Sequence, residues 1–518
     1  MARKLTNIKL GLDDSLEETL AWMAPGYGDY RILRQSVDAR QRHSPHFVYS
    51  VEVFDKGEPV ERPRIQLDRM AYSGLPVVII GAGPAGLFAA LRLGERGIPS
   101  LLLEQGSETG KRVMAISRFW RYGELNPRNN VGFGEGGAGL FSDGKLITRI
   151  KSEHIPYVMQ RLVQFGAPPE IEYLSNPHVG SDRIRRVIPK LREHLRSLQC
   201  EIRFDTKVTE IESRNQQITA VRTDNGDRIP CERVILATGH SSDDMFKHLH
   251  DIGVYMEGKS FAVGLRIEHP QEHINHIQYR EFANHPKLGA ANYKLAFHDR
   301  KDDLGVYSFC MCPGGYVLSS GTDNNGIVSN GMSNYNRGSR FANAAMVVSV
   351  NHEKSFGSDL FGGMKFRAQL EAEGLRLVRE AGGTKQLPAQ RLMDFLEEKS
   401  GPVLDSSSPS GVVATRLDSL FNSDFKKRFA AGLSKFDHDM RGFVSENALL
   451  HGIESRTSCP LRVTRDDTTL QSLSHKGLYP TGEGAGYAGG ITSAACDGIK
   501  VAEAIVAEAT SSVLKARD

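Results

Sequence analysis

The pattern that decides the fold lies between Val77 and Glu104. It reads VVII (77–80), then GAGPAG (81–86), then LFAALRLGER (87–96), and it ends in SLLLE (100–104). The first run is typical of a short buried strand, the glycines of a turn, the third segment of a helix, and the last run of a second buried strand. A strand, a helix and a strand within about 30 residues form a βαβ unit, so the sequence predicts a parallel sheet.

The glycine turn has the spacing of a dinucleotide-binding site. Gly81 allows the tight turn, Gly83 lets the backbone approach a pyrophosphate, and Gly86 permits close packing of the helix on the strand. The free amides at the start of the helix would receive the anion. Glu104, at the end of the second strand, is expected to hold ribose hydroxyls and would repel a 2′-phosphate. This turn alone does not decide between NAD and FAD.

Composition narrows the class of protein. The 518 residues are enough for three to four domains, and 65 Lys and Arg against 62 Asp and Glu leave a net charge of +3. Such a balance provides no field to attract nucleic acid or an anionic membrane. The six cysteines form neither a dense disulfide pattern nor CxxC pairs, which favours a reducing compartment and no metal site. Residues 1–14 lack the apolar run of a signal peptide, so we expect a cytoplasmic protein with no membrane partner.

Hydrophobic periodicity divides the chain into four segments. Residues 4–11, 30–37 and 46–53 alternate like strands and residues 16–23 have helical spacing, which predicts a small α+β domain at 1–72 with a polar linker at 56–69. The nucleotide-binding domain is expected at 73–250 and again at 451–518, around an inserted mixed α/β substrate domain at 251–450. We expect strands at 200–211 and 217–223 in the first part of the nucleotide-binding domain, mainly helices at 368–450 in the insert, and a final helix at 491–509. This is an α/β, doubly wound architecture.

Three further glycine-rich segments carry a family resemblance. They are FGEGGAGLFSDGK (133–145), VILATGHS (234–241) and GEGAGYAGGI (482–491), and they resemble flavoproteins with a glutathione-reductase-like FAD domain. With CMCPGG (310–315) and GIESRTS (452–458) added, nearly the whole chain resembles a little-characterised family of FAD-dependent dehydrogenases of bacteria and plastids. The resemblance implies FAD as the cofactor and a glutathione-reductase-like fold, but it brings no defined substrate.

The resemblance also implies which residues contact FAD. They are Gly81, Gly83 and Gly86 at the pyrophosphate, Glu104 at the adenosine ribose, Val208 at the adenine, Thr238 and Gly239 where the chain crosses the cofactor, Phe133, Gly134, Gly136 and Gly137 beside the isoalloxazine, and Gly482, Glu483, Gly489, Gly490 and Ile491 along the ribityl chain and the flavin ring. Amides at a helix start near Ile491 would stabilise the negative charge of reduced flavin and raise its reduction potential.

Three residues are candidates for catalysis. His240, after a buried strand, could orient the substrate or donate a proton, or it could be a satisfied structural histidine. Arg456 could clamp a substrate carboxylate, or it could pair with Glu454 or another nearby acid. Lys145 lies just past the predicted isoalloxazine segment and is a further candidate. The basic stretch from Arg183 to Arg196 lacks interleaved aromatics, so we expect a solvated helix face and no nucleic acid.

Cys310 and Cys312 allow two interpretations. As a thiol pair they could relay electrons to a flavin, but two residues apart on a regular strand they would form a strained disulfide, and the spacing is CxC rather than CxxC. We therefore expect structural packing and no obligatory redox couple.

These observations predict a FAD-dependent oxidoreductase, a dehydrogenase or reductase that transfers a hydride through flavin N5 to or from a small-molecule substrate. The electron donor stays open, because no second strand, GxGxxG turn and helix marks an NAD(P)H domain. A flavin monooxygenase is the nearest alternative, and oxygen consumption coupled to hydroxylation would identify it. A flavin-holding RNA-binding or scaffold protein without turnover is the alternative from another class.

Overall fold

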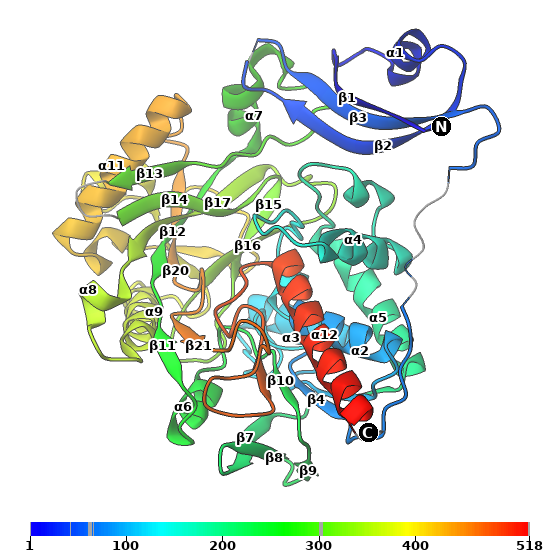
Figure 1. Cartoon of the computed structure of the whole chain (residues 1–518). Helices are drawn as coiled ribbons and strands as arrows, with labels where there is room; N and C mark the ends of the chain where they lie inside the picture. Colours follow the sequence, from blue (N-terminus) through cyan, green and yellow to red (C-terminus); the bar gives the residue numbers. More distant parts are fainter. Residues whose placement is uncertain (1, 42, 61–64, 66, 300–303, 516–518) are drawn as a thin grey trace.

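The computed structural model describes residues 2–41, 43–60, 65, 67–299 and 304–515 (Figure 1). The N-terminal unit contains β1 (Arg3–Leu10), α1 (Leu16–Met23), β2 (Tyr27–Asp38) and β3 (His46–Asp55). Its antiparallel sheet has the order β1-β3-β2, and Leu20 of α1 packs in the same apolar core as Val51 of β3. The predicted strands and helix of this unit are confirmed. The predicted linker has no helix or strand where it is described, and 61–64 and 66 lie outside the described residues.

A parallel sheet forms the second unit, in the order β22-β10-β4-β5-β6. Its strands are β4 (Val77–Ile80), β5 (Ser100–Leu103), β6 (Cys200–Arg203), β10 (Val234–Leu236) and β22 (Leu478–Pro480), and all neighbouring pairs are parallel. The βαβ prediction is confirmed, and β22 joins the sheet from the far end of the chain. Every residue of β4 and β5 is buried, as expected for parallel strands covered on both faces.

Two different layers cover this parallel sheet. On one face lie α2 (Pro84–Glu95), α4 (His154–Gln164), α5 (Ser181–Ser197) and α12 (Ile491–Lys515), which share an apolar core with the sheet. On the other face, α6 (Asp243–Asp251) packs together with the antiparallel sheet of β7 (Val208–Arg214), β8 (Gln217–Thr223) and β9 (Arg228–Pro230). The strand expected at 200–211 is therefore two strands, because the chain turns between them at Asp205, which has a φ of 53°.

A seven-stranded sheet, here called the large sheet, lies beside the parallel sheet (Figure 1). Its order is β13-β14-β17-β12-β20-β18-β19, with strands β12 (Phe261–Pro270), β13 (Ala296–Asp299), β14 (Leu304–Cys312), β17 (Phe341–Val350), β18 (Leu387–Arg391), β19 (Val412–Ala414) and β20 (Leu449–Glu454). In sequence it falls between β10 and β22. Its apolar face packs against α7 (Gln271–Tyr279), α11 (Ser423–Asp439) and the N-terminal unit.

The remaining elements connect these sheets. They are α3 (Thr109–Tyr122), α8 (His352–Phe356), α9 (Gly362–Glu380), α10 (Leu392–Leu396), and the strand pairs β11 (Met256–Gly258) with β21 (Leu461–Val463) and β15 (Gly315–Ser319) with β16 (Ser329–Ser333). The expectation of mainly helices over 368–450 missed β18 and β19. The short LPAQR run of β18 has no strand periodicity and is held by pairing to β19 and β20. Within the described residues, no helix combines the length and apolarity needed to cross a bilayer.

Candidate functional site

The first glycine turn joins β4 to α2. Gly81 has a φ of 105°, and a Cβ there would lie 2.4 Å from the Ala237 carbonyl oxygen. A Cβ at Gly86 would lie 2.0 Å from the carbonyl oxygen of Gly81. Both positions therefore require glycine for packing. Gly83 differs, because a Cβ there would meet only the Cα of Gly137, at 3.9 Å. As the N-cap of α2 it also makes no side-chain hydrogen bond, so the start of the helix has both open space and uncapped amides.

Glu104 is buried at the end of β5, where its carboxylate binds three backbone amides. It accepts hydrogen bonds from the N–H groups of Ala82 at 2.8 Å, Gly106 at 2.9 Å and Gly134 at 3.0 Å. The carboxylate thus joins the first turn to two other loops. The contact of Glu104 with ribose stays a prediction. In the structure this carboxylate has a structural role, because it holds the three loops together.

The segment from Phe133 to Gly137 lies directly against the first turn. The amide of Gly136 donates to the Ala82 carbonyl at 2.9 Å, and a Cβ at Gly137 would lie 3.0 Å from the Cα of Gly83. The buried guanidinium of Arg112 holds the segment by donating to the carbonyls of Asn130, Val131, Gly134, Glu135 and Gly137. Sequence reasoning missed Arg112, because nothing in its helical context distinguishes it from a surface arginine.

Thr238 and Gly239 follow β10 and bring the first turn and the C-terminal turn together. Gly239 has a φ of 71°, and a Cβ at Gly484 would lie 2.4 Å from its carbonyl oxygen. Val208 is buried at the start of β7, where it pairs with Thr223. The predicted crossing segment therefore lies between the two glycine turns, while Val208 belongs to the layer on the other face of the parallel sheet.

A buried ion pair anchors the C-terminal turn. Asp497 of α12 accepts from Arg465 at 2.6 and 3.0 Å and from the amide of Gly482 at 2.8 Å. The Arg465 guanidinium also stacks on Tyr487, 3.9 Å from the ring centre. Tyr487 therefore packs against this arginine. Arg465 and Asp497 are 32 positions apart in the sequence, and no sequence pattern links them, so sequence reasoning did not find this ion pair.

The end of this turn is open. Gly489 and Gly490 are exposed, a Cβ at Gly489 would meet nothing within 4 Å, and Gly490 has a φ of 146°. The expected set of three amides aimed at a flavin needs one correction. The Gly489 amide already donates to Ser493 Oγ at 3.2 Å, so the amides of Gly490 and Ile491 are the remaining candidates at the start of α12.

Glu483 projects from the same turn without a protein partner. Burial, with a contribution from nearby Cys310, raises the pKa of its carboxyl to about 7, although Lys259 acts in the opposite direction. Among the described residues no hydrogen bond or ion pair to this side chain is found. A half-buried carboxyl group in this state is suited to accept hydrogen bonds from hydroxyl groups of a bound molecule.

Two of the predicted catalytic residues lie close together. Arg456 makes a bidentate ion pair with Glu371, at 3.0 and 2.9 Å, and also donates to Ser241 at 3.0 Å. The structural alternative for this arginine is thus observed, with Glu371 as the acid, whereas Glu454 pairs with Arg266. Burial first, and then the charges of Arg367 and Arg456, lower the pKa of His240 to about 3. This imidazole is therefore neutral near pH 7.

Lys145 lies in a different place. Its ammonium group donates a hydrogen bond to the carbonyl of Met311, between Cys310 and Cys312 on β14. The predicted catalytic set is therefore divided between a cluster around His240 and Arg456 and a second cluster around Lys145. In the part of the chain that is described, no group of three or more His, Cys, Asp or Glu side chains is arranged to hold a metal ion.

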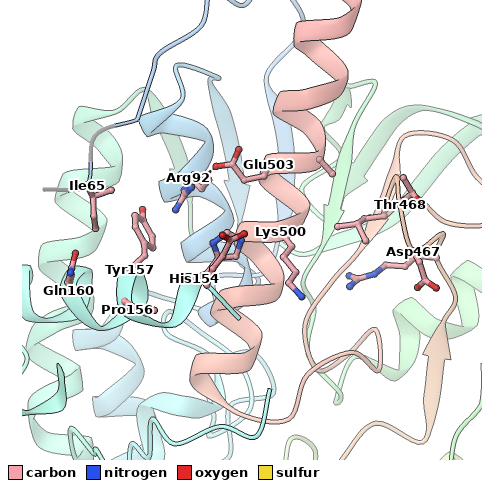
Figure 2. A pocket seen from close by; sticks show the side chains of 14 residues that line it. Ile65, Arg92, His154, Pro156, Tyr157, Gln160, Asp467, Thr468, Lys500 and Glu503 are labelled. Carbon is pink, nitrogen blue, oxygen red and sulfur yellow. Dashed lines mark hydrogen bonds and ion pairs between the residues drawn. The ribbon is translucent and has the colours of Figure 1, made fainter. Parts of the chain in front are cut away.

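A pocket of about 910 Å³ lies elsewhere, between α2, α4, α12 and the loop at 465–470 (Figure 2). Arg92 in this pocket pairs with Glu503 at 2.5 Å and lies over the ring of Tyr157, 4.2 Å from its centre. None of the predicted cofactor residues lines this pocket. Arg465, which anchors the C-terminal turn through Asp497, does line it.

The glycine turns fit FAD. Gly83 leaves open space at an uncapped helix start, and the Glu483 carboxyl lacks a protein partner. The first feature suits a pyrophosphate and the second suits the hydroxyls of a ribityl chain. The Thr238–Gly239 segment lies against both turns, since a Cβ at Gly81 would lie 3.4 Å from the Thr238 Cα and one at Gly484 would lie 2.4 Å from the Gly239 carbonyl oxygen.

Comparison with known proteins agrees with this site. Residues 75–239 match the family of pyridine nucleotide-disulphide oxidoreductases, residues 260–457 match the C-terminal domain of FAD-dependent proteins, and residues 26–54 match a domain of unknown function. An uncharacterized protein of Clostridium beijerinckii (strain ATCC 51743 / NCIMB 8052) is 40% identical over 531 residues, which cover 98% of this chain and 99% of that protein.

Solved structures show more distant similarity. A mutant of halogenase PltM in complex with FAD is 12% identical over 84% of this chain and 70% of its own, with a TM-score of 0.39. Glycine oxidase from Bacillus cereus ATCC 14579 is 12% identical over 83% of this chain and 97% of its own, with a TM-score of 0.32. At this level of similarity the structures do not bear on the reaction. The full-length relative and the two family matches establish that the chain belongs to a family of FAD-dependent oxidoreductases, with FAD as its cofactor.

Proposed function

We propose that the protein is a dehydrogenase or reductase that passes a hydride through flavin N5 between an electron donor and a small-molecule substrate. The observation that supports this proposal is the meeting of polar groups from two sheets. Glu483 follows the parallel sheet, whereas Lys145 donates to the Met311 carbonyl on β14 of the large sheet, next to Cys310, and the charge of Cys310 contributes to the raised pKa of Glu483. The substrate would bind between the two sheets, beside these groups.

The glycine turns would hold the cofactor in this proposal. The amides at the start of α2 bind the pyrophosphate, Glu104 the adenosine ribose, and Glu483 the ribityl hydroxyls, while the amides of Gly490 and Ile491 lie along the flavin ring. Bound FAD supplies N5, which accepts and donates hydride. The glutathione-reductase-like, doubly wound domain at 73–250 and 451–518, with 251–450 as an inserted substrate domain and 1–72 as a separate unit, is part of the same proposal.

The predicted catalytic residues have different tasks in this proposal. Lys145 carries a positive charge beside the substrate, where its Nζ can donate a hydrogen bond to a substrate oxygen. Arg456 is occupied by Glu371, so it is a positioning residue that holds Ser241 and the segment after β10. His240 is neutral and can accept or donate a hydrogen bond, but it does not carry charge to the site.

Anaerobic reduction of the purified FAD-bound protein tests this function. We expect one of a panel of two-electron donors, including NADH, NADPH and small dithiols, to bleach the flavin absorbance, and an organic acceptor to restore it without oxygen. Oxygen consumption matched by a hydroxylated product would instead identify a monooxygenase. Flavin that no donor reduces would contradict turnover and favour a flavin-holding scaffold.

A further inference from the structure

Cys310 and Cys312 lie on a β-bulge. β14 pairs with β17 through Phe309 and Ala345, and the pairing resumes at Cys312 and Asn343, so two residues of β14 oppose one of β17. Cys310 has a φ of 46°, in the left-handed region that residues with a side chain rarely adopt. The regular strand assumed from the sequence is therefore wrong, and the geometric argument against a close thiol pair does not hold.

A hydrogen bond joins the two cysteines, and they differ in burial. The Cys312 thiol donates to the Cys310 carbonyl oxygen, which lies 3.3 Å from Cys312 Sγ. Cys312 is fully buried, whereas Cys310 is only half-buried. Cys310 is thus the more exposed residue of the two.

Two cations hold the backbone of this bulge. Arg266 donates to the Cys310 carbonyl at 3.3 Å and is fixed by a bidentate pair with Glu454, at 2.9 and 3.0 Å. Lys145 donates to the carbonyl of Met311, the residue between the two cysteines. These contacts place fixed positive charge beside the thiols.

The hydrogen bond and the charges make the two thiols unequal. The hydrogen bond from Cys312, followed by the charges of Arg266 and Lys145, lowers the pKa of the Cys310 thiol to about 7 against the opposing effects of burial and Glu454. The same hydrogen bond and burial raise the pKa of Cys312. A thiol of lowered pKa on the more exposed residue, next to a buried thiol, suits thiol–disulfide exchange.

The pair also lies at the predicted flavin site. Cys310 contributes to the raised pKa of Glu483 in the C-terminal turn, and Lys145 follows the segment that packs against the first turn. The bulge therefore places the thiols where the two glycine turns and the large sheet meet. The other four cysteines, at positions 200, 231, 459 and 496, are all buried.

We propose that Cys310 and Cys312 form a dithiol–disulfide couple that exchanges electrons with FAD and with a thiol or disulfide group of a second molecule. This rests on the proposed function and names its substrate class. The Cys310 thiolate and the Cys312 thiol give up two electrons and one proton to form the S–S bond, and FAD takes both electrons and the proton. An external dithiol restores the pair when one thiolate attacks Cys310 Sγ and displaces Cys312, and its second thiolate then releases Cys310 and leaves as a disulfide.

Mass spectrometry of the unmodified FAD-bound protein tests the couple directly. Trypsin releases residues 302–337 as one peptide that contains Cys310, Cys312 and no other cysteine. After equilibration in mixtures of reduced and oxidised dithiothreitol, acid quenching and alkylation, we expect this peptide to change from doubly alkylated to disulfide-bonded in one two-electron transition. The other four cysteines serve as internal controls. A peptide that stays doubly alkylated at the most oxidising ratio overturns the proposal.

Flavin reduction by dithiothreitol provides the second readout. Under anaerobic conditions we expect the wild-type flavin to bleach rapidly, and the flavin of Cys310→Ser and Cys312→Ser to be reduced no faster than free FAD. Photoreduction of the bound flavin should be the same in all three proteins. If dithiothreitol bleaches the flavin of the two variants as fast as that of the wild type, and photoreduction is normal, the couple is overturned and the proposed function stays intact. If the wild-type protein forms the disulfide but its flavin responds to no other donor or acceptor, the broader function alone is overturned. If a variant fails to fold, the peptide measurement decides by itself.

Discussion

The two glycine-rich turns look alike in sequence, and each contains closed positions, where a Cβ would collide with backbone, and open positions, where it would not. At Gly81, Gly86 and Gly484 a Cβ would meet backbone oxygens at 2.4, 2.0 and 2.4 Å, whereas at Gly489 it would meet nothing within 4 Å. Gly83 belongs with the open group even though it lies between two closed positions. Glycine is thus required at the closed positions by the protein's own packing, and at the open positions it leaves room for a bound molecule. Substitutions at the two kinds of position should fail in different ways.

A closed position should control folding. We expect Gly86→Ala to reduce the free energy of unfolding by on the order of 3 kcal/mol, because its Cβ collides with backbone that cannot move without distorting the turn. Urea titration followed by circular dichroism measures this change. Gly110→Ala, at an exposed glycine with open surroundings in the first turn of α3, is the control and should not destabilise the protein. Equal effects would mean that closeness to the Gly81 carbonyl does not constrain the turn.

An open position should control binding and leave the fold intact. We expect Gly83→Val to lose FAD because the branched side chain occupies the space of the pyrophosphate, while its circular dichroism spectrum stays that of the wild type. Heat release and chromatography should identify the wild-type cofactor as FAD. Retention of FAD by the variant, or release of FMN from the wild type, would contradict the assignment of this turn to the pyrophosphate.

The same distinction shows how far sequence reasoning could go. The βαβ unit was predictable because VVII, GAGPAG and the following helix are each defined by neighbouring residues, and the structure places β4, α2 and β5 where this pattern indicates. The bulge at Cys310 was not predictable, since it arises from the register of β14 against β17, whose sequence gives no signal of an extra residue.

Long-range polar contacts were equally hidden. Arg112 of α3 binds backbone carbonyls of residues 130–137. Arg465 meets Asp497 only because β22 and α12 pack beside β10 and α2. Arg456 was named as a candidate from the sequence, but its partner Glu371 lies on α9, far from it in the chain, and could not be chosen from spacing. Local patterns thus predicted the glycine turns, whereas the groups that hold these turns in place required the fold.

The open end of the C-terminal turn should affect the reduction potential of the flavin more than its affinity. We expect Ile491→Pro to lower the two-electron midpoint potential by about 30–65 mV, since one charge-assisted hydrogen bond of about 1.5–3 kcal/mol is lost. Proline is tolerated at the first helical residue, whereas the φ of 146° at Gly490 excludes it there. Dithionite titration beside a reference dye gives the potential. Ile491→Val keeps the amide and should leave the potential unchanged, and an unchanged or higher value in the proline variant would show that this turn only packs.

The smallest expected effect concerns Glu483. Burial raises the pKa of its carboxyl from the ordinary value of 4.5 to about 7. Below the lower value both the folded and the unfolded protein hold the proton. Between the two values the unfolded chain has lost it and the folded chain has not, so this group contributes stability at low pH that is lost as the pH rises through about 7. Glutamine is neutral throughout. In FAD-free protein we therefore expect Glu483→Gln to match the wild type at about pH 4 and to exceed it by on the order of 1–2 kcal/mol at about pH 8, a value reduced for the half-buried side chain. Urea titrations at the two pH values measure the difference, and the exposed Glu446→Gln controls for the loss of one negative charge. A Glu483→Gln difference that is the same at both pH values would mean that the carboxyl already has a partner when FAD is absent.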